Sequence, residues 1–171
     1  AKQALDWVKD FAQATPLELR EVVEAFAQLK TYGIDPTNGS LLALVDAMAK
    51  QGKGAEHLSG LITAVGQAWT KQKLQGEEIM QLMERGIPVW DLLAKATGKS
   101  IPVLQKLSEK GKLGRKEIAL LLQAIGKDAA GASEKFSKTW TGVLSNLRDA
   151  WTNFVQMVGE AGIFELFKNQ L

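Results

Sequence analysis

The stretch Ile87-Pro88-Val89-Trp90-Asp91-Leu92-Leu93 decides the fold, because the chain repeats its pattern almost at once as Ile101-Pro102-Val103-Leu104-Gln105-Lys106-Leu107. In both copies a proline precedes apolar residues spaced by three and four. Proline is accepted in the first turn of a helix, where its missing N–H leaves no hydrogen bond unmade. Gly98 follows the first copy and Gly111 the second, and glycine is the usual residue just beyond a helix. The repeat therefore predicts two short helices, each opened by proline and closed by glycine.

The same helical spacing extends outward to both ends of the chain, and no alternation of period two persists long enough for a strand. Thr15-Pro16-Leu17-Glu18 predicts a helix start with Thr15 as the N-cap, and Ser40 is expected to cap the next helix. A longer helix is predicted from about residue 55 to residue 75, before Gly76. The predicted fold class is all-α, a multi-helix bundle of short helices punctuated by glycine and proline.

The last part of the sequence has a different pattern, which we call the C-terminal seam. Its aromatic and aliphatic residues recur at three and four and are Phe136, Trp140, Val143, Leu147, Trp151, Phe154 and Val158. A helix of about 26 residues, roughly 39 Å long, would carry them on one face. We expect residues 1–130 to form a compact bundle. Residues 131–171 would add a long amphipathic helix and a short terminal one, packed on the bundle or paired with another copy. The candidates for such packing are Trp140, Leu147, Trp151 and Phe154.

Composition narrows the possible functions. The chain has 171 residues, a net charge of +2, no cysteine and a single histidine, His57. These counts exclude disulfides, cysteine-ligated metals and histidine-pair metal motifs. We expect no catalytic residues, no cofactor and no metal, and hence no enzyme. No apolar run approaches the roughly 18 residues of a membrane span. The first residues already have a helical pattern without an initiator methionine, so we expect an excised piece of a longer protein.

Two motifs suggest binding of phosphate or nucleic acid, but the sequence around each favours another interpretation. Gly98-Lys99-Ser100 is similar to the end of a phosphate-binding loop, but it follows a predicted helix instead of a strand. A basic cluster around Gly111 and Gly114 is compatible with a helix-turn-helix nucleic-acid binder. The helix that follows, however, is almost wholly apolar, which favours a solvated loop between core helices. A membrane-active amphipathic helix is the other alternative for the seam, although its opposite face is poor in lysine.

Several segments in order resemble the conserved block of phage tail tape measure proteins. They begin with the stretch from Trp69 to Glu78 and continue with Gln81-Leu-Met-Glu-Arg-Gly-Ile-Pro-Val-Trp-Asp-Leu-Leu-Ala. Leu107-Ser-Glu-Lys-Gly-Lys-Leu and the region from Phe136 to Trp151 follow. The resemblance covers roughly residues 33–162, and its structural motif residues are Gly76, Gly86, Pro88, Gly98 and Gly111.

This resemblance implies a structural role in tail length determination and tail assembly. It implies tail tube protein and tail assembly chaperones as partners, with self-association through the long helix as a further possibility. It also implies a location in the host bacterial cytoplasm during assembly and in the tail lumen of the virion afterwards. It supplies no catalytic residue, no cofactor and no small-molecule substrate. A continuous helix of this length would reach only about 260 Å, so the chain is expected to be a folded module of a larger protein, not the ruler itself.

Overall fold

A computed structural model describes residues 2–139, and every regular element within that range is helical. The α-helices are α1 (Lys2–Gln13), α2 (Leu19–Thr31), α3 (Ser40–Lys50), α4 (Ala55–Lys71), α5 (Gly76–Glu84), α6 (Val89–Thr97), α7 (Ile101–Glu109), α8 (Arg115–Asp128) and α9 (Ala132–Thr139). A short 3-10 helix, η1 (Pro36–Asn38), precedes α3. The prediction of an all-α bundle of short helices is confirmed.

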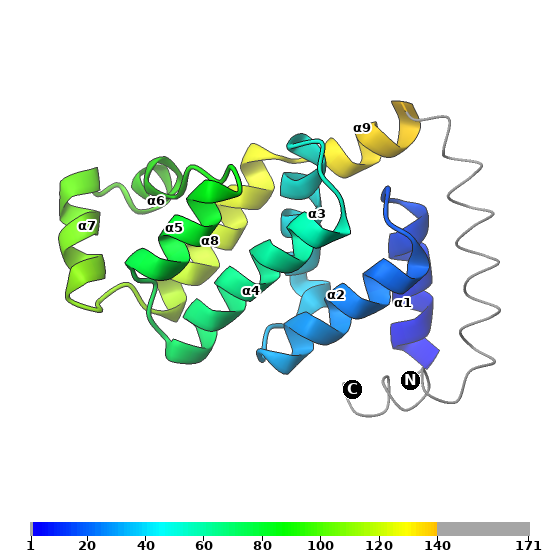
Figure 1. Ribbon diagram of the computed structural model, residues 1–171, viewed down its shortest axis with the longest axis horizontal. Helices are drawn as coiled ribbons and strands as arrows, with labels where there is room; N and C mark the ends of the chain where they lie inside the picture. The colour runs from blue at the N-terminus through cyan, green and yellow to red at the C-terminus, as the bar shows by residue number, and fades with distance from the viewer. Residues whose placement is uncertain (1, 140–171) are drawn as a thin grey trace.

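The helices are arranged along one long axis, with α1 at one end and α7 at the other (Figure 1). Helices α3, α4 and α8 form the centre, where each packs against the other two. Helix α2 joins α1 to this centre, while α6 lies between α8 and α7. The apolar face of each central helix is fully buried, as shown by Leu41, Leu44 and Met48 of α3 and by Leu58, Leu61 and Ile62 of α4.

Five helix ends share one backbone motif, which explains why glycine follows several of the helices. In each, an N–H bonds to the carbonyl oxygen five residues earlier, as in the 3.0 Å bond from Ile34 to Leu29. The residue before that N–H has a positive φ, which glycine adopts without the steric penalty of a Cβ. Four of the five positions are glycine, and the exception is Gln72 with φ +59°. The five residues are Gly33, Gly52, Gln72, Gly86 and Gly111.

Three predicted helix boundaries are wrong. Helix α2 begins at Leu19 with Glu18 as its N-cap, so Thr15 lies outside the helix. The reason is that Glu21 accepts the Glu18 N–H at 2.9 Å, while Leu17 and Val22 are buried on either side of this cap. That is the arrangement of a capping box with a hydrophobic staple.

At α3, Ser40 is the first helical residue and not the cap, because Asn38 Oδ1 accepts both the Ser40 N–H and its hydroxyl. At α4, the helix ends at Lys71 and does not reach residue 75. The left-handed conformation of Gln72 turns the chain there, and Leu74 N–H then bonds to Leu113 at 2.8 Å.

Candidate interaction surfaces

The motif residues named from the sequence all lie at helix boundaries. Gly76 is the first residue of α5, Pro88 is the N-cap of α6, and Gly98 ends α6 in a left-handed conformation. Gly86 and Gly111 end α5 and α7 with φ of +84° and +66°. The side-chain amide of Gln51 lies against Gly86 and donates to its carbonyl at 3.1 Å. Each of these residues lies where a helix begins or ends, and their structural role in the family stays a prediction.

Two turns with similar sequences meet near the α7 end of the molecule. Lys73-Leu74 is followed by Glu78-Ile79, and Lys112-Leu113 is followed at the same spacing by Glu117-Ile118. Leu74 and Leu113 are both buried and are joined by the 2.8 Å backbone hydrogen bond. Each glutamate bonds back to the start of its helix, Glu117 to the Gly114 N–H at 2.9 Å and Glu78 to the Gln75 N–H at 3.4 Å. This hydrogen bond therefore joins the turn before α5 to the turn before α8.

Glu78 is the more deeply buried of the two glutamates. Its side chain is only 2% exposed and forms an ion pair with Lys71 at 2.5 Å. Beside it, the Ser108 hydroxyl donates to the Leu74 carbonyl at 3.0 Å. The buried carboxylate of Glu78 and the buried hydroxyl of Ser108 thus each have a polar partner within the fold.

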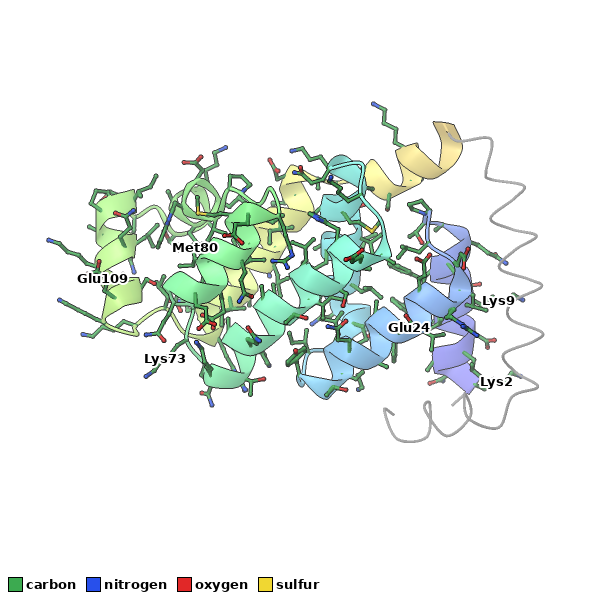
Figure 2. All side chains as sticks on the ribbon, viewed as in Figure 1. Lys2, Lys9, Glu24, Lys73, Met80 and Glu109 are labelled. Carbon is green, nitrogen blue, oxygen red and sulfur yellow. The ribbon has the colours of Figure 1, made fainter. Side chains whose placement is uncertain are left out.

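The basic cluster lies in α7, in the turn after it and at the start of α8, near Glu109 in Figure 2, and its members are Lys106, Lys110, Lys112, Arg115 and Lys116. One of its members is engaged within the fold, because Arg115 donates to the Trp69 carbonyl at 3.0 Å and stacks on the indole at 4.8 Å. Helix α8 itself is a central helix, with Ile118, Leu121 and Ile125 buried. Because α3, α4 and α6 pack against it, the structure favours the other interpretation of the cluster, a solvated loop that leads into a core helix.

Helix α4 passes close to two neighbouring segments at its glycines. A Cβ at Gly66 would lie 2.2 Å from the Tyr32 ring, and a Cβ at Gly60 would lie 2.1 Å from the Arg85 guanidinium. Half-buried His57, one turn before Gly60, has its Nε2 3.0 Å from the Arg85 carbonyl. Burial lowers the pKa of His57, against the opposing effect of that hydrogen bond, and the charges of Arg85 and Lys53 lower it further. This histidine is a structural contact between α4 and the end of α5.

Apolar groups are exposed at two places on the described surface. A groove of about 520 Å³ runs between α3 and α8, where small residues such as Ala43, Ala119 and Gly126 form part of its lining and Leu42 lies 46% exposed. On α5, Met80 is 62% exposed, and Figure 2 shows it on the outer face of that helix; Met83, one turn on, is 46% exposed. Apolar groups of this kind are commonly used for contact with other proteins.

A buried polar contact that sequence analysis missed fixes α9 on α3. Asp46 is 4% exposed, and its Oδ1 accepts the Ser133 N–H at 2.9 Å and the Ser133 hydroxyl at 2.5 Å. A carboxylate at a helix N-terminus satisfies free N–H groups and favours the helix dipole. The available signal was a lone aspartate among the core positions of α3.

The packing candidates Trp140, Leu147, Trp151 and Phe154 lie outside the described residues. Within residues 2–139, no helix is long and apolar enough to cross a membrane, and no three His, Cys, Asp or Glu side chains gather as a metal site would require.

The described residues thus form an all-α structural module. Its short helices are joined by hydrogen-bonded turns, and a few apolar side chains remain on its surface. The chain belongs to the tape measure protein family, because the family model described as tape measure protein matches residues 1–160.

Two relatives are similar to this chain over nearly its whole length. The Mu-like prophage FluMu protein gp42 of Haemophilus influenzae is 45% identical over 167 residues, which cover 96% of this chain and 26% of the relative. The probable tape measure protein of Escherichia phage Mu is 26% identical over 173 residues, which cover 100% of this chain and 25% of the relative. The chain thus spans about a quarter of the length of the relatives it matches. No solved structure matches it.

Proposed function

We propose that this chain is a folded module of a phage tail tape measure protein, acting in tail assembly as a binding surface for other tail proteins. The observation that carries the proposal is the family match over residues 1–160. It is supported by the similarity to the probable tape measure protein of phage Mu over the whole chain.

The compactness of the bundle argues that the module does not act as a measuring rod. As one continuous helix the chain would extend about 260 Å. Instead, the longest described helix, α4, has 17 residues, or about 25 Å. Short helices folded back on one core add little to the length of a tail. We therefore infer that the module provides a binding surface and does not itself span tail length.

The partners proposed are the tail tube protein and tail assembly chaperones, encountered in the host cytoplasm before the module enters the tail lumen. The exposed apolar groups on α3 and α5 support protein contact, since most apolar side chains of the bundle are buried. Exposed apolar patches mark contact sites when they gather on one face.

Affinity capture from the phage-producing host tests this proposal. The tagged chain is compared with Leu42→Asp on α3 and Met80→Asp on α5, which remove the two apolar groups separately. Both side chains are largely exposed, so the variants should keep the wild-type helical circular dichroism. A matched control is Gln105→Asp on the exposed side of α7.

We expect the wild-type chain to capture tail tube protein or a tail assembly chaperone. One of the two apolar variants should reduce the captured amount at least tenfold. Retention of the same protein by all three variants would place the contact elsewhere on the module. Recovery of neither class of protein, from a lysate in which both are present, would contradict the proposed function.

A further inference from the structure

Most of the large apolar side chains that are exposed on the described surface belong to two short helices, α5 and α7. Met80 and Met83 are exposed on α5 and Val103 is exposed on α7, while the remaining one, Leu42, lies on α3. Both short helices lie in the half of the molecule away from α1 (Figure 1). Exposed apolar groups that gather in one part of a surface mark a contact site. The charged side chains beside them indicate what that site can bind.

The exposed side of α5 is acidic. The helix contains three glutamates and no basic residue. Glu78 is buried and paired with Lys71, so the exposed charges are those of Glu77 and Glu84. These two residues are three before and four after Met80, which places the three side chains on one side of the helix. We call Glu77, Met80 and Glu84 the acidic face.

The exposed side of α7 has the same spacing of three and four but the opposite charge. Lys106 and Lys110 follow Val103 by three and seven residues, so these exposed side chains also lie on one side of their helix. We call Val103, Lys106 and Lys110 the basic face. Residues 99–116, which surround it, contain six basic residues and one acidic residue, Glu109. The basic face therefore lies in a strongly positive part of the surface.

The two faces do not pair with each other inside the fold. Helix α5 packs mainly on α4, and α7 packs mainly on α6. The buried residues of α7 are Leu104 and Ser108, which at 100° per residue lie on the side of the helix away from the basic face. Within residues 2–139, none of the four charged side chains of the two faces forms an ion pair. Their opposite charges are thus left available for contact between molecules.

We propose that the acidic face of one copy of this chain packs on the basic face of another copy. The occupant is a second copy because each chain carries both halves of the contact, an exposed apolar side chain on each face and opposite charges beside them. Complementary charges steer such surfaces together and fix their register, while burial of Met80 and Val103 adds the apolar contact of an interface core. Since every chain has both faces, the pairing can be reciprocal, as in a two-fold dimer.

Sedimentation equilibrium of the purified 171-residue chain tests the proposal, and its outcome does not depend on whether tail proteins bind. The wild-type chain should form species larger than the 18.6 kDa monomer as its concentration is raised. Two double variants each reverse one face: Glu77→Lys with Glu84→Lys on α5, and Lys106→Glu with Lys110→Glu on α7. Each variant then has two faces of like charge, so its association constant should fall at least about tenfold.

A matched control changes the net charge equally without touching either face. Lys2→Glu with Arg20→Glu, exposed on α1 and α2, makes the same charge change as the α7 variant and should associate like the wild-type chain. All of the substituted side chains are exposed, so circular dichroism should show wild-type helix content in every variant.

Mixing the two face-reversed variants decides the outcome. In the mixture, each face again finds a face of opposite charge on the other variant, so mixed species should form with nearly wild-type affinity. A wild-type chain that stays monomeric at every concentration overturns the proposal. Association that survives both reversals also overturns it, in favour of a contact elsewhere such as the C-terminal seam. Failure of the mixture to restore association overturns the pairing of these two faces.

Discussion

Asp46 of α3 and Ser133 of α9 are 87 residues apart in sequence and are joined by two hydrogen bonds to one carboxylate oxygen. The Asp46 carboxylate is buried, and it accepts from both the backbone and the side chain at the start of α9. This contact sets where α9 begins and the side of the helix that faces the bundle. Helices α3 and α9 also pack against each other, so the carboxylate is one part of the contact that places α9.

Replacing this aspartate should release α9 while leaving the rest of the bundle folded. For Asp46→Ala we expect a loss of about 1–3 kcal/mol, because the N–H and hydroxyl of Ser133 lose their buried acceptor. Hydrogen exchange should show the lost protection mainly in residues 132–139. Asp128→Ala is the control, because its ion pair with Lys50 is solvent-exposed and should be worth less than about 1 kcal/mol. Equal losses in the two variants would contradict this account.

Close packing at Gly66 predicts that adding even one methyl group there lowers the stability of the fold. A Cβ would lie 2.2 Å from the Tyr32 ring, so Gly66→Ala should lower the free energy of unfolding by about 1–3 kcal/mol despite the better helix propensity of alanine. Gly76→Ala is the matched control, because nothing lies within 4 Å of a Cβ at that helical glycine. Urea denaturation measures both. A Gly66→Ala chain as stable as the Gly76→Ala chain would show that Tyr32 does not pack as described.

His57 should make stability fall in mildly acidic solution. Its pKa is lowered in the folded chain, mainly by burial, so the unfolded chain binds a proton first as the pH falls. The stabilising contribution is therefore complete above pH 6.5, the ordinary pKa, and is lost as the pH falls through the lower folded pKa. His57→Gln should remove this part of the decrease, as measured by urea denaturation between pH 7.5 and 5.5. An unchanged pH profile in the variant would assign the decrease to other groups.

Glu78 and Glu117 occupy equivalent positions in the two similar turns but differ in burial. We expect Glu78→Gln to cost about 1–2 kcal/mol, since it removes the buried carboxylate that pairs with Lys71, whose own side chain is 42% exposed. Glu117→Gln should cost less than about 1 kcal/mol, because glutamine retains the capping bond to Gly114. Thermal unfolding of the two variants checks this order. The reverse order would mean that the Lys71 pair does not stabilise the turn.

The fold class and most helix positions follow from the sequence because they depend on local chemistry. Apolar spacing of three and four identifies the helices, and glycine in a left-handed conformation ends them. The Thr15 prediction was wrong because capping depends on which nearby residue is buried, and here Leu17 is in the core. The helix end at Lys71 was missed because Gln72 adopts a conformation that favours glycine, held by the Leu74–Leu113 bond.

The candidate surfaces were less predictable than the helices. The sequence does not show that Asp46 meets Ser133, or that α3 and α8 leave a groove between them, because both depend on tertiary packing. The apolar sequence after the basic cluster already favoured a loop between core helices, but local charge does not reveal that Arg115 stacks on Trp69. Membership of the tape measure family was predictable from the order and spacing of its motifs.

In-frame removal of this module from the phage's tape measure gene, followed by electron microscopy of the lysate, tests the central claim most directly. A compact module that binds other tail proteins is needed for assembly but does not set tail length by its own extent. The account therefore predicts that assembled tails are lost. Assembled tails shortened by about 260 Å, the length of the chain as one continuous helix, would contradict it by showing that the segment acts as a ruler. Tails of normal length and number would contradict a role in assembly.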